Sequence, residues 1–371
     1  MRAYFFFCFL LNISLLFAQT NASIFHDGET RTFVYYTPTS WNANQQLPVL
    51  FVLHGLTQTG AGVMNITDFN TIAEDNNFIV CYPDGVNNSF NANMNITVST
   101  ADDLGFMEAL VVYFEQNFNT DPLKRYLCGF SNGGFMSHKL VCESSLCFAA
   151  IATVSGNMSD TTYNNCSPNH LTSVLHIHGT GDPVVSYFGG VTTGKSVEAV
   201  MEKWRAYMGC DLIPNMIPMP DNNIFDLSYP ERYTYNLCGN YSLELIKIIN
   251  GGHQWPGIAT LIGGLGNINM DFYSPQVIWD FLSSKSCPNT TFIHHGLNKK
   301  INCYPNPSQD QINIIVNGYN GGVKIDVYDL QARLLETTTN NIVSLKKYKK
   351  GIYILKINYG DKTEKVRVVK E

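Results

Sequence analysis

The chain has 371 residues, of which 45% are apolar, 12% aromatic and 15% charged, and its formal net charge is −6. Abundant apolar residues and a low net charge exclude an intrinsically disordered protein, and the length predicts one large domain with a smaller one. Residues 299–371 contain 13 Lys and Arg and 7 Asp and Glu, which gives this segment a formal charge of +6. Residues 1–298 therefore have a formal charge of −12. An acidic body argues against nucleic acid as its partner, because binding phosphates requires clustered Lys and Arg.

The N-terminus has the pattern of a secretory signal peptide. Arg2 precedes an apolar run over residues 3–17, and Ala18 supplies a small residue at its end. We therefore predict a signal peptide over residues 1–18 and a secreted or cell-surface protein that is exported through the periplasm. No later segment has the roughly 18 consecutive apolar residues typical of a membrane-spanning helix, so no membrane span is expected in the mature chain.

Alternating strand and helix patterns follow over residues 19–286. Short runs that are apolar on both faces predict central strands of a parallel sheet, at residues 48–53, 78–82, 126–128 and 173–177. A further strand is predicted over residues 243–249. Apolar residues at three- and four-residue spacing predict helices over 104–118, 196–208 and 275–282. Asp102 and Asp103 are placed to cap the first of these helices. The order of elements predicts an α/β domain with a mostly parallel central sheet.

The pattern changes after Cys287. A polar linker is predicted over residues 287–300, and alternating strand patterns follow at 312–316, 323–328 and 352–358, separated by Asn and Gly turns. No helical periodicity intervenes. Residues 301–371 are therefore predicted to form a small antiparallel β-domain.

A strand-turn-helix motif contains the first candidate catalytic residue. Gly129-Phe130-Ser131-Asn132-Gly133 follows a predicted strand and precedes apolar residues at helical spacing. Such a turn lifts a serine hydroxyl above the sheet, and the backbone N–H after the serine then points at a developing oxyanion. We predict Ser131 as the nucleophile and the Asn132 N–H as one oxyanion donor. An ordinary Gly-rich loop is the alternative.

The second oxyanion donor is expected where an earlier buried strand ends, at His54-Gly55-Leu56. The backbone N–H of Leu56 is the candidate. His54 is interpreted as a structural histidine beneath this loop.

A serine hydroxyl needs a base, and the base needs an acid to orient it. Asp182 follows the predicted strand 173–177, and His253 follows the predicted strand 243–249. Open α/β sheets build their sites just beyond such strand ends, and the order serine, acid, histidine is typical of one large class of hydrolytic folds. We predict Asp182 as the acid and His253 as the base, with a turn-forming Asp and a loop histidine as the alternatives.

Other aromatic and imidazole side chains lie close to these residues in the sequence. Phe130 and Trp255 are candidate substrate contacts, and packing is the alternative for Trp255. His176 and His178 alternate along one strand without an accompanying cluster of Asp, Glu or Cys, so a structural role is favoured over metal binding. We predict no metal and no cofactor.

Ten cysteines suit an oxidising compartment. Cys8 lies in the predicted signal peptide, so nine remain and at least one must be unpaired or intermolecular. Cys81 and Cys128 lie in apolar, strand-like runs and are expected to be buried free thiols. The spacings contain no paired Cys-x-x-Cys, which argues against a zinc site.

Taken together, these motifs make residues 31–286 resemble the secreted esterases that include polyhydroxybutyrate depolymerases and feruloyl or acetylxylan esterases. The segments that carry the resemblance are Leu53-His54-Gly55, Tyr82-Pro83-Asp84-Gly85, residues 102–106, 129–134, 176–182 and 252–257. It implies an α/β-hydrolase fold, Ser131, Asp182 and His253 as the triad, and a disulfide between Cys210 and Cys238. Cys142 with Cys166 is a second pair, with Cys147 as a competitor. Phe90 lies where such enzymes often carry Trp.

The C-terminal residues resemble the sorting domain of the type IX secretion system of Bacteroidetes. The match lies in Cys303-Tyr304-Pro305-Asn306-Pro307, residues 327–330, residues 350–354 and the basic end 365–370. It implies that residues 301–371 form a small β-sandwich that the type IX secretion machinery recognises as a partner.

The sequence thus predicts a secreted serine esterase that hydrolyses carboxylic esters through an acyl-enzyme. Its substrate is expected to be a polyester such as polyhydroxybutyrate, or feruloyl or acetyl esters of plant polysaccharide. The alternatives are a serine peptidase with the same triad and a non-catalytic surface protein that binds polymers.

Overall fold

A computed structural model of the chain describes residues 19–95, 98–259, 265–288, 301–304, 308–316, 319, 321–329, 333–360 and 362–370. The chain divides into two compact units between Pro288 and Asn289, inside the predicted linker. The predicted signal peptide and residues 289–300 of the linker lie outside the described residues. Within the described ranges, no helix is both long enough and apolar enough to cross a membrane.

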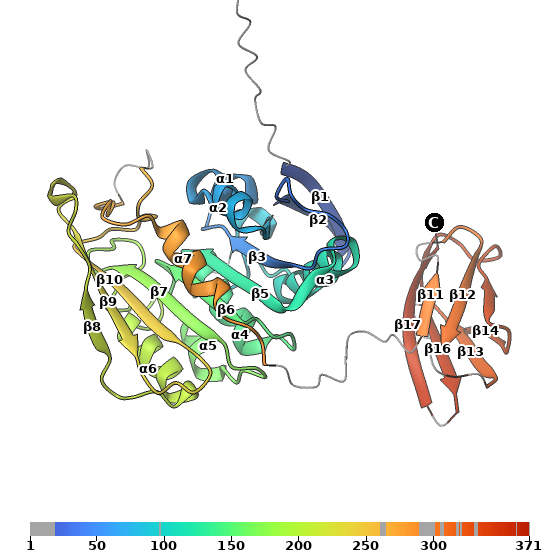
Figure 1. The fold of residues 1–371 in the computed structure, drawn as a ribbon. Helices are drawn as coiled ribbons and strands as arrows, with labels where there is room; N and C mark the ends of the chain where they lie inside the picture. The colour runs from blue at the N-terminus through green and yellow to red at the C-terminus, as the bar shows by residue number, and fades with distance from the viewer. Residues whose placement is uncertain are drawn as a thin grey trace, which may run out of the picture. The chain divides into compact units, whose positions relative to one another are not determined.

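The first unit is built on a ten-stranded sheet of order β1-β2-β4-β3-β5-β6-β7-β10-β9-β8 (Figure 1). The six strands from β4 to β10 in this order are parallel, and the strands at both edges are antiparallel. The strands are β1 (Gln19–His26), β2 (Glu29–Tyr36), β3 (Leu47–Leu53), β4 (Ile79–Pro83), β5 (Thr120–Phe130), β6 (Ala150–Val154), β7 (Ser173–Gly179), β8 (Asn215–Pro218), β9 (Tyr229–Tyr235) and β10 (Leu243–Ile249). The predicted α/β fold class is confirmed. The five predicted strands correspond to β3, β4, β5, β7 and β10.

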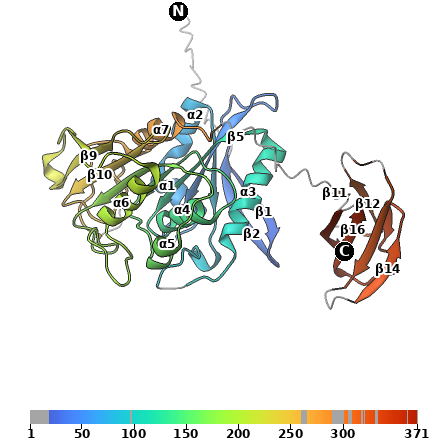
Figure 2. The same cartoon turned by 90° about the horizontal axis from the view of Figure 1, so that it is seen from below.

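Helices cover both faces of this sheet (Figures 1 and 2). One apolar core packs side chains of α3, α4 and α6 against the sheet, and the other packs those of α1, α2 and α7. The helices are α1 (Gly60–Thr67), α2 (Phe69–Asn76), α3 (Asp103–Phe118), α4 (Asn132–Glu143), α5 (Asp160–Asn165), α6 (Val197–Met208) and α7 (Ser274–Ser283), with 3-10 turns η1 (Val86–Asn88) and η2 (Ile224–Asp226). Each predicted helix is present with its ends shifted by at most one residue.

The two acidic residues before α3 have different roles. Asp102 caps the helix as predicted, since its Oδ1 accepts a hydrogen bond from the Gly105 N–H at 2.9 Å. Asp103 is instead buried in an ion pair with Arg31, and its Oδ2 accepts from the Asn91 N–H at 2.6 Å. The interpretation of Asp103 as a cap is therefore corrected. Its charge balances the buried guanidinium of Arg31, which lies 72 positions away in the sequence.

The second unit consists of two antiparallel sheets around their own apolar core, as predicted for a small β-sandwich. One sheet has the order β11-β12-β15 and the other β14-β13-β16-β17. The strands are β11 (Ile301–Tyr304), β12 (Gln311–Val316), β13 (Val323–Tyr328), β14 (Leu334–Thr338), β15 (Ile342–Ser344), β16 (Gly351–Tyr359) and β17 (Lys362–Lys370). Of the motif at residues 303–307, Pro305 to Pro307 lie outside the described residues.

Three disulfides cross-link the first unit. They join Cys210 to Cys238, the pair that the family resemblance implied, Cys142 to Cys166, and Cys147 to Cys287. Cys81 and Cys128 are buried free thiols, as expected, and their burial raises their pKa values.

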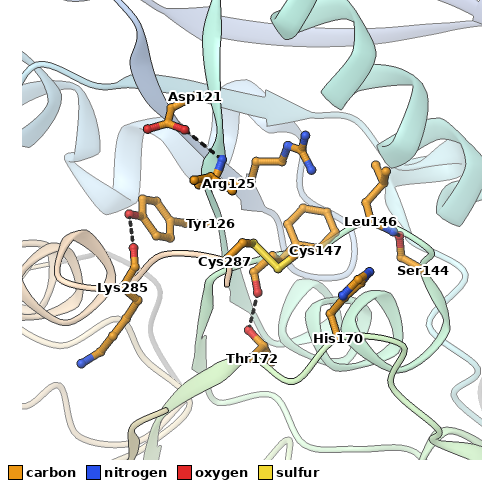
Figure 3. The surroundings of a disulfide bond; sticks show 12 residues. Asp121, Arg125, Tyr126, Ser144, Leu146, Cys147, His170, Thr172, Lys285 and Cys287 are labelled. Carbon is orange, nitrogen blue, oxygen red and sulfur yellow. Dashed lines mark hydrogen bonds between the residues drawn. A yellow bond between two sulfur atoms is a disulfide. The ribbon is translucent and has the colours of Figure 1, made fainter. Parts of the chain in front are cut away.

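The Cys147–Cys287 bridge fastens the end of the first unit to its sheet (Figure 3). The Tyr126 hydroxyl of β5 donates to the Lys285 carbonyl at 2.8 Å, and the Cys287 N–H donates to the Leu123 carbonyl at 2.8 Å. The segment after α7 is therefore held against β5 by two hydrogen bonds, and the disulfide links it to Cys147, which lies between α4 and β6.

Replacing both Cys147 and Cys287 by alanine is expected to lower the free energy of unfolding by about 2–5 kcal/mol, because the bridge restricts the unfolded chain. Its half-cystines are 140 positions apart, whereas those of Cys210–Cys238 are 28 apart. The loop-length dependence predicts that losing Cys147–Cys287 costs about 1.4 kcal/mol more than losing Cys210–Cys238. Chemical denaturation of both double variants measures the difference, and an equal or smaller loss for the longer loop would contradict this account.

Candidate active site

Ser131 lies in a strained turn between β5 and α4. Its φ is 52° and its ψ is −118°, a backbone conformation that non-glycine residues rarely adopt. The Ser131 N–H donates to the Val154 carbonyl at 2.9 Å, which ties the turn to the neighbouring strand β6. Strain that the surroundings hold in place is typical of a nucleophile at a strand-to-helix turn.

The glycines of this motif are required by close backbone contacts. A Cβ added to Gly129 would lie 2.1 Å from the Gly133 carbonyl oxygen, and one on Gly133 would lie 2.1 Å from the Leu53 carbonyl oxygen. Any side chain at either position would therefore push β5, α4 and the end of β3 apart. The glycine spacing is thus explained by the packing of the turn.

The two candidate oxyanion donors belong to the first residue of α4 and to the loop after β3. The Asn132 N–H is at the first position of α4, where a helix provides no intrahelical acceptor. Gly55, next to Leu56, packs against the serine, because a Cβ built on Gly55 would lie 3.4 Å from the Ser131 Cβ. Among the hydrogen bonds of the described residues, none uses the N–H of Leu56. Both N–H groups remain available to a ligand beside the serine.

His54 holds the loop that carries Leu56. Its Nδ1 donates to the Gly55 carbonyl at 2.7 Å, and its Nε2 accepts from the Gly85 N–H at 2.9 Å. Burial lowers the pKa of His54, so the ring is neutral and can make both hydrogen bonds at once. This geometry fits the structural role predicted for it.

The side chain of Asn132 has a role that sequence reasoning missed. Its Oδ1 accepts from the Phe90 N–H at 2.8 Å, and its Nδ2 donates to the Phe90 carbonyl at 3.1 Å. Lys139 of the same helix donates to the Asn91 carbonyl at 2.7 Å. Helix α4 therefore anchors the loop around Phe90 beside the serine. The only available signal was an amide side chain directly after the serine.

Asp182 and His253 are hydrogen-bonded to each other, although they are 71 positions apart. The distance between His253 Nδ1 and Asp182 Oδ2 is 2.8 Å. The other carboxylate oxygen accepts from the N–H groups of Val184 and Val185, at 2.8 and 2.7 Å. Burial acts to raise the pKa of Asp182, but these hydrogen bonds and the neighbouring imidazoles outweigh it, so the pKa is lowered. Asp182 is therefore an ionised acceptor that fixes the hydrogen of His253 on Nδ1 and leaves Nε2 as a base.

The loops that carry this pair are bonded directly to each other. The Gly181 N–H donates to the Gly251 carbonyl at 2.9 Å, and the Asn250 N–H donates to the Thr180 hydroxyl at 2.9 Å. Because β7 and β10 are neighbouring parallel strands, their C-terminal ends meet at one edge of the sheet. The structure therefore brings Asp182 and His253 together beyond these strand ends, and their roles as acid and base stay predictions.

Phe130 and Trp255 support the imidazole of His253. The Phe130 ring lies 5.0 Å from the His253 ring and 6.2 Å from the Trp255 ring, measured between centroids. Trp255 is 1% exposed and Phe130 is 6% exposed. Both rings therefore pack beside the imidazole, and since His253 itself is only 5% exposed, their predicted contact with substrate stays a prediction.

Phe130 also connects the Ser131 turn with the loop that carries His253, because it directly precedes Ser131 and its ring lies against the His253 ring. The contacts of the described residues include no hydrogen bond between the Ser131 hydroxyl and His253. Hydrogen bonds of this kind are often long without a ligand and shorten when one binds. The described ranges contain no group of three or more His, Cys, Asp or Glu side chains that could hold a metal ion.

Comparison with known proteins gives two family matches. Residues 26–222 match the model of the putative esterase family, and residues 302–371 match that of the secretion system C-terminal sorting domain. The chain is similar to a bifunctional acetylxylan esterase/xylanase of Neocallimastix patriciarum (25% identity over 69% of this chain) and to a probable feruloyl esterase C of Aspergillus flavus (29% over 50%). It spans 33% of the first relative and 67% of the second.

Among solved structures, the chain is similar to an acetyl xylan esterase from Aspergillus awamori. The TM-score is 0.49 at 16% sequence identity, and the match covers 71% of this chain and 99% of the other.

Proposed function

This chain belongs to the putative esterase family, and from that premise we propose that it is a secreted serine hydrolase of carboxylic esters. The observation that carries the proposal is the buried Asp182–His253 hydrogen bond at the sheet edge where Ser131 occupies its strained turn. The predicted triad, Ser131, Asp182 and His253, is part of this proposal. So are the oxyanion donors, the N–H groups of Asn132 and Leu56.

In the proposed mechanism, His253 Nε2 takes the Ser131 proton while Oγ attacks the ester carbonyl carbon. The oxyanion is stabilised by the two N–H groups, and the alcohol leaves with the proton returned by His253. A water molecule, deprotonated by the same imidazole, then attacks the acyl-enzyme. The bond to Ser131 Oγ breaks, His253 returns the proton to Oγ, and the carboxylic acid is released. Asp182 remains ionised throughout and stabilises the imidazolium through its Nδ1–H.

We propose acetyl or feruloyl esters of plant polysaccharide as the substrate class, since the two curated relatives are named for those activities. Polyhydroxybutyrate-type polyester is the second class. The test compares hydrolysis of methyl ferulate, acetylated xylan, p-nitrophenyl acetate and polyhydroxybutyrate film by the wild-type protein. A second test asks whether a fluorophosphonate probe labels Ser131. Failure to label Ser131, or cleavage of peptide but not ester bonds, would overturn the proposal.

The match at residues 302–371 supports secretion through the type IX machinery as the role of the second unit. This unit has its own apolar core, and the first unit is built around two other clusters of apolar residues. We expect a protein of residues 19–298 to keep full esterase activity per molecule. In the native host, the chain lacking residues 299–371 should accumulate in the periplasm.

Assays on soluble and insoluble esters, with and without the second unit, check this expectation together with cell fractionation. Selective loss of activity on an insoluble polymer, with unchanged export, would identify the second unit as a substrate-binding module instead.

A further inference from the structure

Two histidines that the mechanism does not use lie directly behind the proposed acid. His176 and His178 project from the same face of β7, and both are buried. Their rings stack at 5.3 Å between centroids with an interplanar angle of 7°. His178 Nε2 lies 2.8 Å from the Val185 carbonyl oxygen and 3.5 Å from Asp182 Oδ2.

The partners of His178 determine which of its nitrogens carries the hydrogen. A carbonyl oxygen and a carboxylate can only accept, so Nε2 must donate to them. Burial lowers the pKa of His178 to about 4, and a neutral ring carries no second hydrogen on Nδ1. Nδ1 must therefore accept.

The same reasoning extends along the chain of contacts. His178 Nδ1 is 3.1 Å from His176 Nε2, which must then be the donor. His176 Nδ1 is left as an acceptor, and it lies 2.8 Å from the hydroxyl of Thr153, the residue opposite His176 on β6. The hydrogen bonds therefore all run the same way: Thr153 donates to His176, His176 donates to His178, and His178 donates to the Val185 carbonyl.

We propose that His178 is a positioning residue for Asp182, held in the Nε2–H tautomer by His176 and Thr153. Its N–H faces the carboxylate oxygen that receives His253 Nδ1–H. It also donates to the carbonyl of the buried Val185, which would lose this hydrogen bond without the His178 ring. This inference rests on the proposed triad and adds a second histidine, which does not contact the substrate.

The surroundings keep both rings neutral. The ionisable groups that face the pair are Asp182 and His253 from the site loops, His138 from α4, Tyr187 from the segment after β7, and Lys247, which pairs with His178 on β10. His138 stacks on His176 at 6.0 Å between centroids and is itself a buried ring whose pKa is lowered by burial to about 3. If His178 were protonated, its second N–H, on Nδ1, would point at the Nε2–H of His176 and would find no acceptor there.

The tautomers can be measured in the unaltered protein. Long-range proton–nitrogen NMR correlations of histidine-labelled full-length protein are expected to show hydrogen on Nε2 and a bare Nδ1 for both His176 and His178 at neutral pH. Hydrogen on Nδ1 of His178 would overturn the proposal. The measurement does not depend on catalysis, so its failure is distinct from a failure of Ser131 to react with the fluorophosphonate probe.

The effect on turnover is tested with a matched pair at His178. His178→Leu removes the donor, and kcat is expected to fall about tenfold with KM within about twofold of wild type. His178→Gln keeps an N–H near the Nε2 position and should retain kcat within about threefold. A purely structural role would lower the melting temperature of both variants without separating their kcat values, which would refute the proposal.

Two substitutions of Thr153, which change fewer atoms, test the same proposal if a His178 variant does not fold. Thr153→Val keeps the side-chain shape but removes the donor to His176, and kcat is expected to fall about two- to fivefold. Thr153→Ser keeps the hydroxyl and should behave like wild type. Equal kcat values for the two Thr153 variants would remove Thr153 and His176 from the proposal.

Discussion

Replacing Ser131 by alanine is expected to lower kcat for ester hydrolysis by about 10³-fold or more while the fold is retained. The oxyanion donors and the binding surface remain in this variant, but they cannot replace the nucleophile. The removed hydroxyl makes no hydrogen bond within the described part of the chain, so its loss should cost little stability. Stopped assays with p-nitrophenyl acetate and the circular dichroism spectrum measure activity and folding together.

Ser137 provides a matched control for Ser131. It is buried in α4, the helix that follows Ser131, and its hydroxyl donates to the Gly133 carbonyl at 2.9 Å. Ser137→Ala is expected to cost about 1 kcal/mol of stability and to keep the turnover. Near-normal hydrolysis by folded Ser131→Ala would refute Ser131 as the nucleophile.

Asp182→Asn is expected to lower kcat by roughly 10²- to 10⁴-fold. The amide oxygen can still accept from Val184 and Val185, so the loop geometry is preserved. The amide nitrogen, however, can donate to His253 Nδ1, which places the imidazole hydrogen on Nε2. An imidazole in that tautomer cannot take the Ser131 proton. Steady-state kinetics should show the loss in kcat, with an unchanged melting temperature as evidence that folding is intact.

Asp102→Asn is the matched control, because asparagine caps a helix about as well as aspartate and Asp102 lies outside the site. Its kcat should stay within about twofold of wild type. Equal, mild losses for Asp182→Asn and Asp102→Asn would show that another carboxylate orients the base.

Asp103 is not a second control, since its carboxylate is buried against Arg31. Neutralising it leaves the guanidinium without a counter-charge, and such losses cost about 3–5 kcal/mol. Asp103→Asn should therefore reduce the yield of folded protein more than the kcat of the molecules that fold.

The residues placed successfully from sequence share one property, which is that each follows a buried strand. Ser131, Asp182 and His253 come after β5, β7 and β10, and the apolar runs of those strands are visible without knowing their neighbours. Parallel strands bring such positions to one sheet edge. Local patterns thus predicted where these side chains lie.

What the sequence did not predict depends on contacts between distant segments. The Arg31–Asp103 pair and the Cys147–Cys287 bridge join residues 72 and 140 positions apart, and neither partner has a local signal for the other. The edge strand β8 has four exposed side chains and lacks the apolar run of a central strand. Trp255 lies two positions after His253 and Phe130 directly precedes Ser131, but only packing shows that both rings are buried.

The position of the Cys147–Cys287 bridge also determines how the protein responds to mechanical load. Cys287 is the second residue before the boundary between the two units, so tension applied through the second unit reaches the bridge before it reaches α7. The pull then passes through the sulfur atoms to Cys147 and on toward the N-terminus. The covalent loop between these cysteines contains β6, β7, β10 and α7, and with them Asp182 and His253. A traction force on the tail therefore bypasses the segments that carry the acid and the base, and they cannot be drawn out into an extended chain while the bridge is intact.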